Sequence, residues 1–423
     1  MEVFHLIGIK GTGMCALACA LKDLGYQVSG SDYSTNYFTT KILTEKNIYP
    51  LEFSTDNITA DKIYIASHAY DDNNIEVSEI KKQGYQLYYY SKFIEHFFNK
   101  TKIGVSGTHG KTTVTSLIRD FLPKDKTTYI IGDGRGGGVK DYQYFVFEAC
   151  EYKNHFLNYT FDYLVINNIE LDHPDFFKTV DDVLHSFQQA SDRAKCLIIN
   201  GDDSNCQKIS HPHKITFGLN PNNDVYAIIK DQHQYGFLIE VYKQDETILL
   251  NIPYPGIFMV YNVLACLATL EAMGIKNINY QEKIVNFQKP YRRQEEYFYY
   301  DNILIDDYAH HPTEIKMCLQ AIKQKYPDKK LIVIFQPHTY SRTLHLLNEF
   351  KEAFQDLDIF YLEKTFTSVR EQYDEEKEEF ILKQFTNAKR FNVQVLKQIS
   401  KMHNACILFL GAGDVSKHIK SII

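Results

Sequence analysis

The residues with the clearest chemical role lie in the stretch GTHGKTT, at 107–113, which follows a β-branched apolar run. Glycines let backbone N–H groups wrap phosphate oxygens, a lysine meets the β- and γ-phosphates, and a hydroxyl binds Mg²⁺. The spacing between the glycines is shorter than in the common phosphate loop, but the strand-like run before them and the helical pattern after them supply the usual context. We therefore predict an ATP site. The residues assigned to it are Gly107, Thr108, His109, Gly110, Lys111, Thr112 and Thr113.

A second glycine-rich turn lies close to the N-terminus, in HLIGIKGTGMCALACAL. Gly11, Gly13 and Ala16 fit the dinucleotide fingerprint, and Asp32 lies where a ribose-binding acid is expected. Taken alone, this turn would suggest an NAD-dependent dehydrogenase, although any nucleotide diphosphate would satisfy it. A tight strand–helix turn without a ligand is the alternative interpretation.

Acidic residues follow two further strand-like runs. YFVFEACEY presents Glu148 and Glu151, and VINNIELDHPD presents Glu170, Asp172 and His173. The carboxyl ends of parallel strands face the crevice in which ligands bind, so these side chains predict a site for a hard metal ion. We expect Thr112, Glu148 and His173 to form it. For Asp172, which precedes a proline, a helix N-cap is the alternative.

Short apolar runs alternate with helical patterns along the whole chain. Their hydrophobicity is continuous rather than alternating, which indicates parallel sheets covered on both faces. A chain of 423 residues is too long for one core, and the candidate sites lie far apart in the sequence. We predict an α/β fold of three domains. These are a Rossmann-like N-terminal domain (1–99), a central P-loop ATPase-like domain with a parallel sheet (100–289) and a Rossmann-like C-terminal domain (290–423).

Composition narrows the class of protein further. A net charge of −7 argues against a basic surface that binds nucleic acid, and no apolar run is long enough to span a membrane. The eight cysteines form no C-x-x-C pair, so neither a zinc site nor a disulfide framework is indicated. The sequence opens directly on a strand-like run, and we expect a cytoplasmic protein that binds neither nucleic acid nor membrane.

Five motifs together carry a resemblance to a known family. GTHGKTT, NIELDHPD, IDDYAHHPTEI, FQPHTYSRT and FLGAGD occur in the order found in the Mur ligases, and the similarity covers essentially the whole chain. The resemblance implies that the first glycine turn holds the diphosphate of a UDP-sugar and the second holds ATP. UDP-sugar contacts are then expected from Gly11, Thr12, Gly13, Met14, Ser31 and Asp32.

Within the family, the motifs are most similar to the ligases that join L-alanine to the lactyl carboxylate of UDP-N-acetylmuramic acid. That activity implies ATP and Mg²⁺ as cofactors, an acyl-phosphate intermediate, and a monomer or homodimer. Catalytic roles are implied for Lys111, His173, His310 and Arg342. Lys111 would contact the transferring phosphate, Thr112 and Glu148 the Mg²⁺ of ATP, and His173 a second Mg²⁺. Of the remaining residues, Asn262 would contact adenine, Arg293 the phosphates, Asp307 and Tyr308 the ribose and base, and His338 and Arg342 the amino acid.

The chain departs from the family pattern at several of these sites. Phe258 and Met259 stand where a histidine–asparagine pair is frequent, and Gln294 replaces a common aromatic residue. A ligase that recycles a murein tripeptide onto the same UDP-sugar is the alternative inside the family. Outside it, a dehydrogenase would leave GTHGKTT unused, and a non-catalytic P-loop switch would explain only the second turn.

Overall fold

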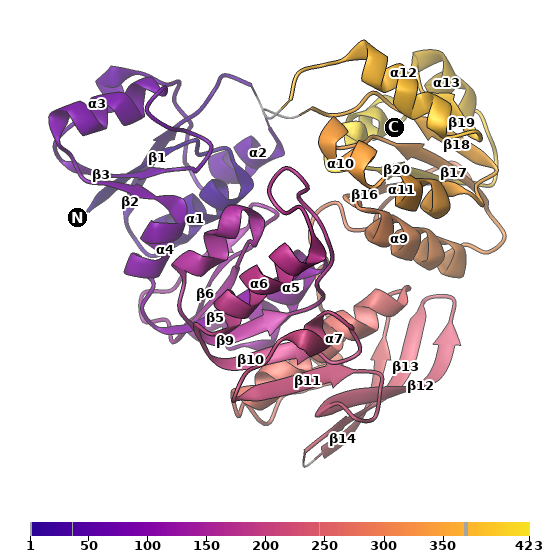
Figure 1. Ribbon diagram of the computed structural model, residues 1–423, viewed down its shortest axis with the longest axis horizontal. Coiled ribbons are helices and arrows are strands. Elements are labelled where there is room, and N and C mark those ends of the chain that lie inside the picture. Colours follow the sequence, from indigo (N-terminus) through magenta and orange to yellow (C-terminus); the bar gives the residue numbers. More distant parts are fainter. Residues whose placement is uncertain (1, 36, 245, 368–370) are drawn as a thin grey trace.

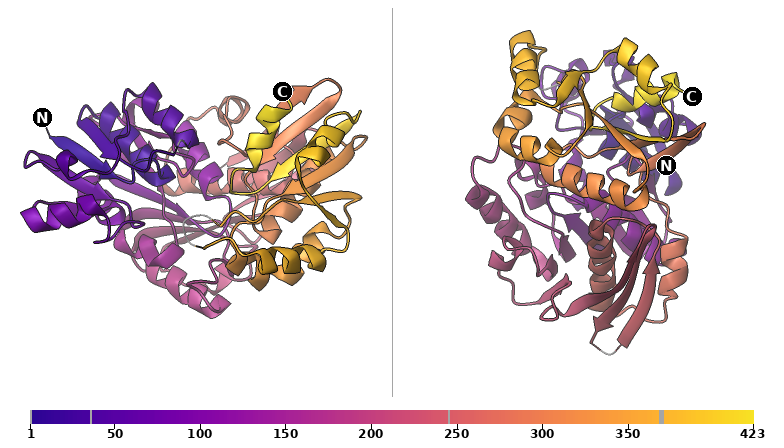
Figure 2. Two further views of the ribbon diagram at one scale, coloured as in Figure 1. Left: turned by 90° about the horizontal axis from the view of Figure 1, so that it is seen from above. Right: turned by 90° about the vertical axis from the view of Figure 1, so that its right-hand side faces the viewer.

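The computed structural model describes residues 2–35, 37–244, 246–367 and 371–423 and contains three sheets, each flanked by helices (Figure 1). The N-terminal and C-terminal sheets lie on opposite sides of the molecule, with the central sheet adjoining both (Figure 1, Figure 2). The prediction of a three-domain α/β fold is confirmed. No helix in the described part of the chain is long and apolar enough to cross a membrane.

The N-terminal sheet has four parallel strands in the order β2-β1-β3-β4, as a Rossmann-like unit requires. Its strands β1 and β3 are buried along most of their length, in keeping with the continuous apolar runs seen in the sequence. The strands are β1 (Val3–Ile7), β2 (Gln27–Ser31), β3 (Lys62–Ala66) and β4 (Leu87–Tyr89), and the helices are α1 (Thr12–Asp23), α2 (Phe38–Glu45), α3 (Ile75–Gln83) and α4 (Tyr90–Phe97).

The central sheet has ten strands in the order β14-β13-β12-β11-β10-β9-β5-β8-β6-β7. Its strands are β5 (Thr101–Ser106), β6 (Thr127–Ile130), β7 (Gly136–Gly137), β8 (Tyr144–Glu148), β9 (Phe161–Ile166), β10 (Ala194–Asn200), β11 (Lys214–Gly218), β12 (Val225–His233), β13 (Gly236–Lys243) and β14 (Glu246–Ile252). The helices are α5 (Lys111–Phe121), α6 (Val180–Ser191), α7 (Ile257–Ala272) and α8 (Tyr280–Val285).

The sequence predicted a parallel central sheet, but part of this sheet is antiparallel. Strands from β12 to β6 run parallel, but β13 and β14 continue the sheet antiparallel, and β7 pairs antiparallel with β6. The added strands are buried on one face only, and their side chains alternate between buried and exposed. Alternation of this kind is typical of antiparallel strands, whereas the continuous apolar runs mark the parallel ones.

The C-terminal sheet has six strands in the order β15-β16-β20-β17-β18-β19, and all neighbours are parallel except β15 and β16. Its strands are β15 (Glu295–Tyr299), β16 (Asn302–Asp307), β17 (Lys330–Phe335), β18 (Ile359–Leu362), β19 (Ala388–Arg390) and β20 (Ala405–Leu410). The helices are α9 (Pro312–Lys325), α10 (Tyr340–His345), α11 (Leu347–Phe354), α12 (Glu375–Gln384) and α13 (Val393–Ile399). Short 3₁₀ helices occur at Thr55–Asn57, Lys124–Lys126, Tyr152–Asn158, Cys206–Lys208 and Val415–Ser421.

The glycine-rich stretch at 132–138 joins the first two sheets through close backbone packing. Helix α1 lies against β7, and a Cβ added at Gly136 would lie 1.8 Å from the carbonyl oxygen of Ala16. At Gly138 an added Cβ would lie 2.9 Å from the carbonyl oxygen of Ala20. The small residues of α1 are buried for the same reason, because both of its sides are covered.

Gly136→Ala should therefore lower the midpoint of chemical unfolding, since the new methyl group meets backbone that cannot rotate away. We expect a loss of about 3 kcal/mol, at the upper end of ordinary overpacking. Gly84→Ala is the matched control, because no atom of the described residues lies within 4 Å of its added Cβ. Its only cost is then the left-handed backbone conformation (φ 72). That control should cost about 1 kcal/mol. Equal losses in the two variants would contradict close packing between α1 and β7.

Candidate functional site

The phosphate loop connects β5 to α5 and has the shape that its sequence predicts. Gly110 has a left-handed backbone (φ 82), and a Cβ there would lie 2.8 Å from the Asn262 side chain and 2.9 Å from that of Asn167. The loop is held by the end of β9: the Thr108 N–H donates to the Asn168 carbonyl (3.0 Å), and the His109 N–H donates to Asn168 Oδ1 (2.7 Å). Glycine is required at Gly110 because of both its backbone angle and its neighbours.

Lys111 is buried and turned back over its own loop. Its Nζ donates to the Gly107 carbonyl (2.5 Å) and lies 3.1 Å from a carboxylate oxygen of Glu151. Burial alone would lower the pKa of Lys111, but the charge of Glu151 outweighs it and raises that pKa. Burial opposes ionisation of Glu151 as well, yet Lys111 keeps its pKa below the ordinary value. The lysine is thus a fixed positive charge beside the loop, in the position that a phosphate group requires.

The three residues expected to bind metal line one cavity of about 230 Å³, together with Lys111. Thr112 hydrogen bonds to Glu148, whose pKa is raised by burial. His173 lies on the other side of Glu151, with its Nε2 3.5 Å from Glu151 Oε1. Its buried Nδ1 has no hydrogen-bond partner in the part of the chain that the structure describes. A hydroxyl and a carboxylate beside a phosphate loop suit Mg²⁺, and the free ring nitrogen gives His173 a spare donor atom.

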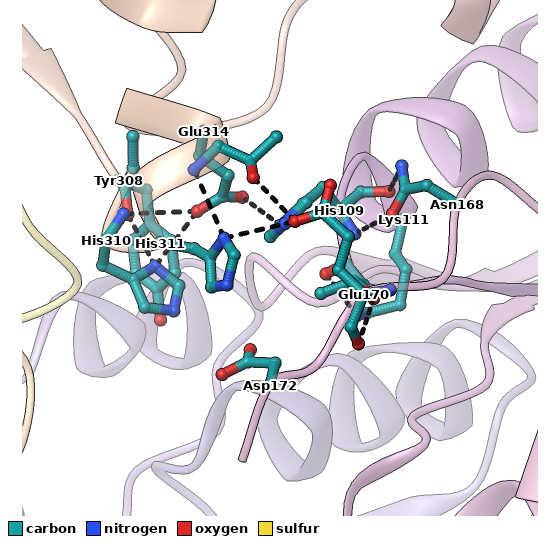
Figure 3. Close-up of polar contacts among 12 residues, drawn as sticks. His109, Lys111, Asn168, Glu170, Asp172, Tyr308, His310, His311 and Glu314 are labelled. Carbon is teal, nitrogen blue, oxygen red and sulfur yellow. Dashed lines mark hydrogen bonds and ion pairs between the residues drawn. The ribbon is translucent and has the colours of Figure 1, made fainter. Parts of the chain in front are cut away.

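Glu314, which the sequence interpretation did not assign, lies at the centre of a charged cluster between the central and C-terminal domains (Figure 3). Its carboxylate oxygens lie 3.5 Å from His109 Nδ1, 3.4 Å from Arg293 Nη1 and 3.4 Å from His310 Nδ1. Burial would raise the pKa of Glu314, but hydrogen bonding and charge from His109 hold it well below the ordinary value. Glu170 faces the other ring nitrogen of His109 at 3.5 Å, and its pKa is about 2 despite burial, chiefly because of His109.

His109 and His310 respond to this cluster in opposite directions. Burial alone would lower the pKa of His109, but Glu170 and Glu314 outweigh it and raise that pKa to about 9. For His310, burial is the largest effect and the nearby Arg342 charge adds to it, so its pKa lies well below the ordinary value. At neutral pH, His109 therefore carries a charge and His310 does not.

Asp172 and Arg342 form a buried ion pair that joins the central and C-terminal domains. Arg342 Nε donates to Asp172 Oδ1 (2.9 Å), and Nη2 lies 3.3 Å from Oδ2. The N-cap interpretation of Asp172 is wrong, because α6 is capped by Thr179 and the carboxylate of Asp172 binds Arg342 instead. Burial opposes its ionisation, but Arg342 holds its pKa well below the ordinary value. His338 also lies here, with Nδ1 3.1 Å from Arg342 Nη1, so the two predicted amino-acid contacts are neighbours.

A second cavity, of about 290 Å³, extends from the phosphate loop between α7 and α9. Asn262, Arg293 and Asp307 line it, as do Phe258 and Met259. The Asp307 carboxylate accepts hydrogen bonds from the backbone N–H groups of Ala309 (2.7 Å) and Gln294 (2.9 Å), so it shapes the neighbouring loops. Tyr308 instead lines the cavity of Lys111, with its ring 5.3 Å from the Arg293 guanidinium.

The residues predicted for the UDP-sugar lie at the turn between β1 and α1 and at the end of β2. Of these six, only Thr12 also lines the cavity of Lys111. The Asp32 carboxylate accepts hydrogen bonds from the backbone N–H groups of Lys10 and Tyr33 (both 2.8 Å). Met14 is buried, and the Ser31 hydroxyl donates to Glu76. Gly11 precedes the first turn of α1, and a Cβ at Gly13 would lie 3.3 Å from the Tyr90 ring.

Comparison with known proteins shows which family has this three-domain architecture. Residues 3–102 match the Mur ligase family catalytic domain, 105–270 the Mur ligase middle domain and 292–416 the Mur ligase glutamate ligase domain. The chain belongs to the Mur ligase family, whose members are ATP-dependent ligases, and the resemblance inferred from the motifs is confirmed.

Among individual relatives, the UDP-N-acetylmuramate–L-alanine ligase of Streptococcus thermophilus is 39% identical over 431 residues, covering 99% of this chain and 97% of the relative. The UDP-N-acetylmuramate-alanine ligase MurC of Thermotoga maritima has a similar structure, with a TM-score of 0.84 at 23% identity and coverage of 100% and 98%. A murein peptide ligase from Psychrobacter arcticus gives a TM-score of 0.76 at 19% identity, with the same coverage. These two structural similarities concern the fold alone.

Asp172→Asn should destabilise the protein strongly, because it leaves the Arg342 charge buried without a counter-charge at hydrogen-bond distance. We expect the free energy of unfolding to fall by about 3–5 kcal/mol in urea denaturation. Asp72→Asn is the matched control, since Asp72 pairs with Lys81 on the surface with most of its side chain exposed. That variant should unfold like the parent protein. If the free energy of unfolding changed by a similar amount in both variants, the buried pair would stabilise the protein no more than the surface pair does.

The charge on His109 predicts a pH-dependent contribution to stability. Its folded pKa of about 9 exceeds the value of about 6.5 expected in the unfolded chain. The contribution, on the order of 3 kcal/mol, is complete below about pH 6.5, shrinks as the pH rises, and is absent above about pH 9.

The free energy of unfolding of the parent protein, minus that of His109→Gln, measures this contribution across the same pH range. A difference that stays constant with pH would contradict the ion pairs of His109 with Glu170 and Glu314.

Proposed function

We propose that this chain joins L-alanine to the lactyl carboxylate of UDP-N-acetylmuramic acid and converts ATP to ADP and phosphate. Whole-length identity of 39% to a ligase of that name supports the substrates. The observation that carries the proposal is the buried Lys111, held charged by Glu151 beside a phosphate loop and facing a cavity shared by the three domains. Such a site suits the transfer of a phosphoryl group away from water.

The chemistry follows from the poor reactivity of a carboxylate toward an amine. A lactyl carboxylate oxygen attacks the γ-phosphorus of ATP, the bond to the bridging oxygen breaks, and ADP leaves. The amine of L-alanine then attacks the acyl carbon of the acyl phosphate, loses a proton, and expels phosphate. Negative oxygens crowd together in the first step, so the main tasks of the protein are to neutralise charge and to position the reactants. Lys111 would exchange Glu151 for the transferring phosphate.

We propose Mg²⁺ as a cofactor because the cavity offers donor atoms that suit it. Thr112 and Glu148 would hold one ion together with phosphate oxygens, and His173 a second beside Glu151. The ions would supply positive charge to the phosphate oxygens. Burial raises the pKa of Glu148, and a cation bound beside it would offset this cost of ionising the carboxylate.

L-Alanine is proposed to bind beside Arg342, His338 and His310. Arg342 has five N–H groups, and among the described residues Asp172 and His338 occupy three of them. The other two are proposed to bind the amino-acid carboxylate. His310 lies nearby, with its ring centre 5.8 Å from that of His338. Because the pKa of His310 is low, its ring is neutral at physiological pH and is suited to accept a hydrogen bond from the attacking amine.

The remaining assignments divide the ligands among the domains. We propose that residues 1–99 bind the UDP-sugar, 100–289 bind ATP, and 290–423 close over the nucleotide and bind the amino acid. Adenine would lie near Asn262, the ribose near Asp307 and Tyr308, and the phosphates near Arg293 and the loop at 107–113. All eight cysteines are free, which supports a reducing compartment such as the cytoplasm. A monomer or homodimer is proposed for solution.

Purified protein with ATP and Mg²⁺ tests the function directly. We expect phosphate release only when both UDP-N-acetylmuramic acid and L-alanine are present, with product mass increased by one alanyl residue. Lys111→Ala should lower kcat by about a thousandfold, while Lys316→Ala, a surface lysine paired with Glu352, should leave it unchanged. Ligation of a tripeptide but not of L-alanine would assign the chain to the recycling ligases. Release without the UDP-sugar would contradict a ligase.

A further inference from the structure

A second kind of metal site is suggested by two histidines and a glutamate that meet between the central and C-terminal domains. His109 belongs to the phosphate loop, Glu170 follows β9, and His311 precedes α9 (Figure 3). One ligand atom from each of these residues lies within 4.8 Å of the other two. None of them belongs to the proposed Mg²⁺ set.

The distances within this cluster are close to those of a coordination sphere. His109 Nε2 lies 3.5 Å from Glu170 Oε2, and His311 Nδ1 lies 3.7 Å from the same oxygen. Ligands of a tetrahedral zinc ion are separated by about 3.4 Å, given Zn–N and Zn–O bonds of about 2.1 Å. Two edges of the triangle therefore need to shorten by only a few tenths of an ångström, and a small rotation of the His311 ring would adjust the third.

Burial and unused bonding capacity also favour a ligand here. Both histidines are more than nine-tenths buried, and within the described residues the Nε2 atom of each makes no hydrogen bond. His109 Nε2 has only the ion-pair contact with Glu170 at 3.5 Å, and coordination through it requires loss of its proton. The Nδ1 of His311 accepts only a long hydrogen bond from the Thr313 N–H (3.3 Å), which coordination would replace. Unsatisfied buried polar atoms are costly, and a cation bound to His109 Nε2 would remove that cost for His109, whereas His311 would coordinate through Nδ1.

The surroundings of the three residues resemble the outer shell of known metal sites. Glu314 lies 3.5 Å from the Nδ1 of His109, on the side of the ring opposite to Glu170. A carboxylate in that position orients a ligating imidazole and increases its basicity. Thr313 donates to Glu170 Oε2 (2.6 Å) and would fix the ligating carboxylate in the same way. Both outer residues come from α9, so the C-terminal domain supplies one ligand and both supports.

We propose that His109, Glu170 and His311 form a binding site for a divalent transition-metal ion of the Zn²⁺ class, which links the central and C-terminal domains. Two imidazoles and one carboxylate are a set that Zn²⁺ favours, whereas Mg²⁺ prefers oxygen ligands throughout. His109 borders both cavities, so the ion would lie beside the phosphate loop. Its occupancy would hold the two domains together and slow ligation.

Metal titration of the full-length protein without nucleotide tests the proposal. We expect one Zn²⁺ per chain, with affinity retained in a thousandfold excess of Mg²⁺ and visible absorption typical of tetrahedral coordination when Co²⁺ is the probe. His311→Asn and Glu170→Gln should each weaken binding at least tenfold, and Glu314→Gln should weaken it about tenfold through its effect on His109. His345→Asn, an exposed histidine in α10, is the matched control and should bind like the parent protein.

Two further readouts separate this site from the catalytic one. Zn²⁺ should inhibit ligation by the parent protein, and His311→Asn should require at least tenfold more Zn²⁺ for the same inhibition. Zn²⁺ should also slow proteolysis of the parent protein but not of His311→Asn. The absence of a saturable Zn²⁺ site would overturn the proposal. So would unchanged Zn²⁺ binding in folded His311→Asn and Glu170→Gln, or loss of binding in His173→Asn with those two variants unaffected. Each result is independent of whether L-alanine is the amino acid.

Discussion

The structure depends on matching buried charges across the boundary between the central and C-terminal domains. Asp172 and Arg342 pair through two contacts, and Glu314 lies among His109, Arg293 and His310. A buried charge without a partner is far more costly than the pair is stabilising, so each domain requires the other to complete its own electrostatics. The cavity at this boundary is thereby specified by charge pairing as well as by shape.

The fold follows from the sequence wherever burial is two-sided. Strands such as β5, β16 and β20 are apolar along their length, and their runs predict parallel strands directly. Strands β13 and β14 have one exposed face and a weaker pattern, so the sequence interpretation missed them. The glycine-rich stretch around Gly136 is visible in the sequence, but the need for glycine there is not. That need comes from packing against Ala16, which lies more than a hundred residues earlier in the chain.

The candidate site also divides into residues that the sequence could locate and pairings that it could not. The phosphate loop and the acidic strand ends could be located because local order fixes them: a strand, a turn and a helix must follow one another. Asp172, Glu151 and Glu314 could not be given their roles, since each depends on a partner distant in sequence. Glu314 had one local clue, because it lies four residues after His310 and the start of α9 brings their side chains together.

The ion pair of Asp172 with Arg342 has a consequence for the timing of the reaction cycle. Any movement that separates the central and C-terminal domains must return both charges to water in the same event, since each meets the other at hydrogen-bond distance. Separating the two charges before water reaches both sets an electrostatic barrier to opening. If the nucleotide binds between the domains as proposed, its residence time would depend on that barrier.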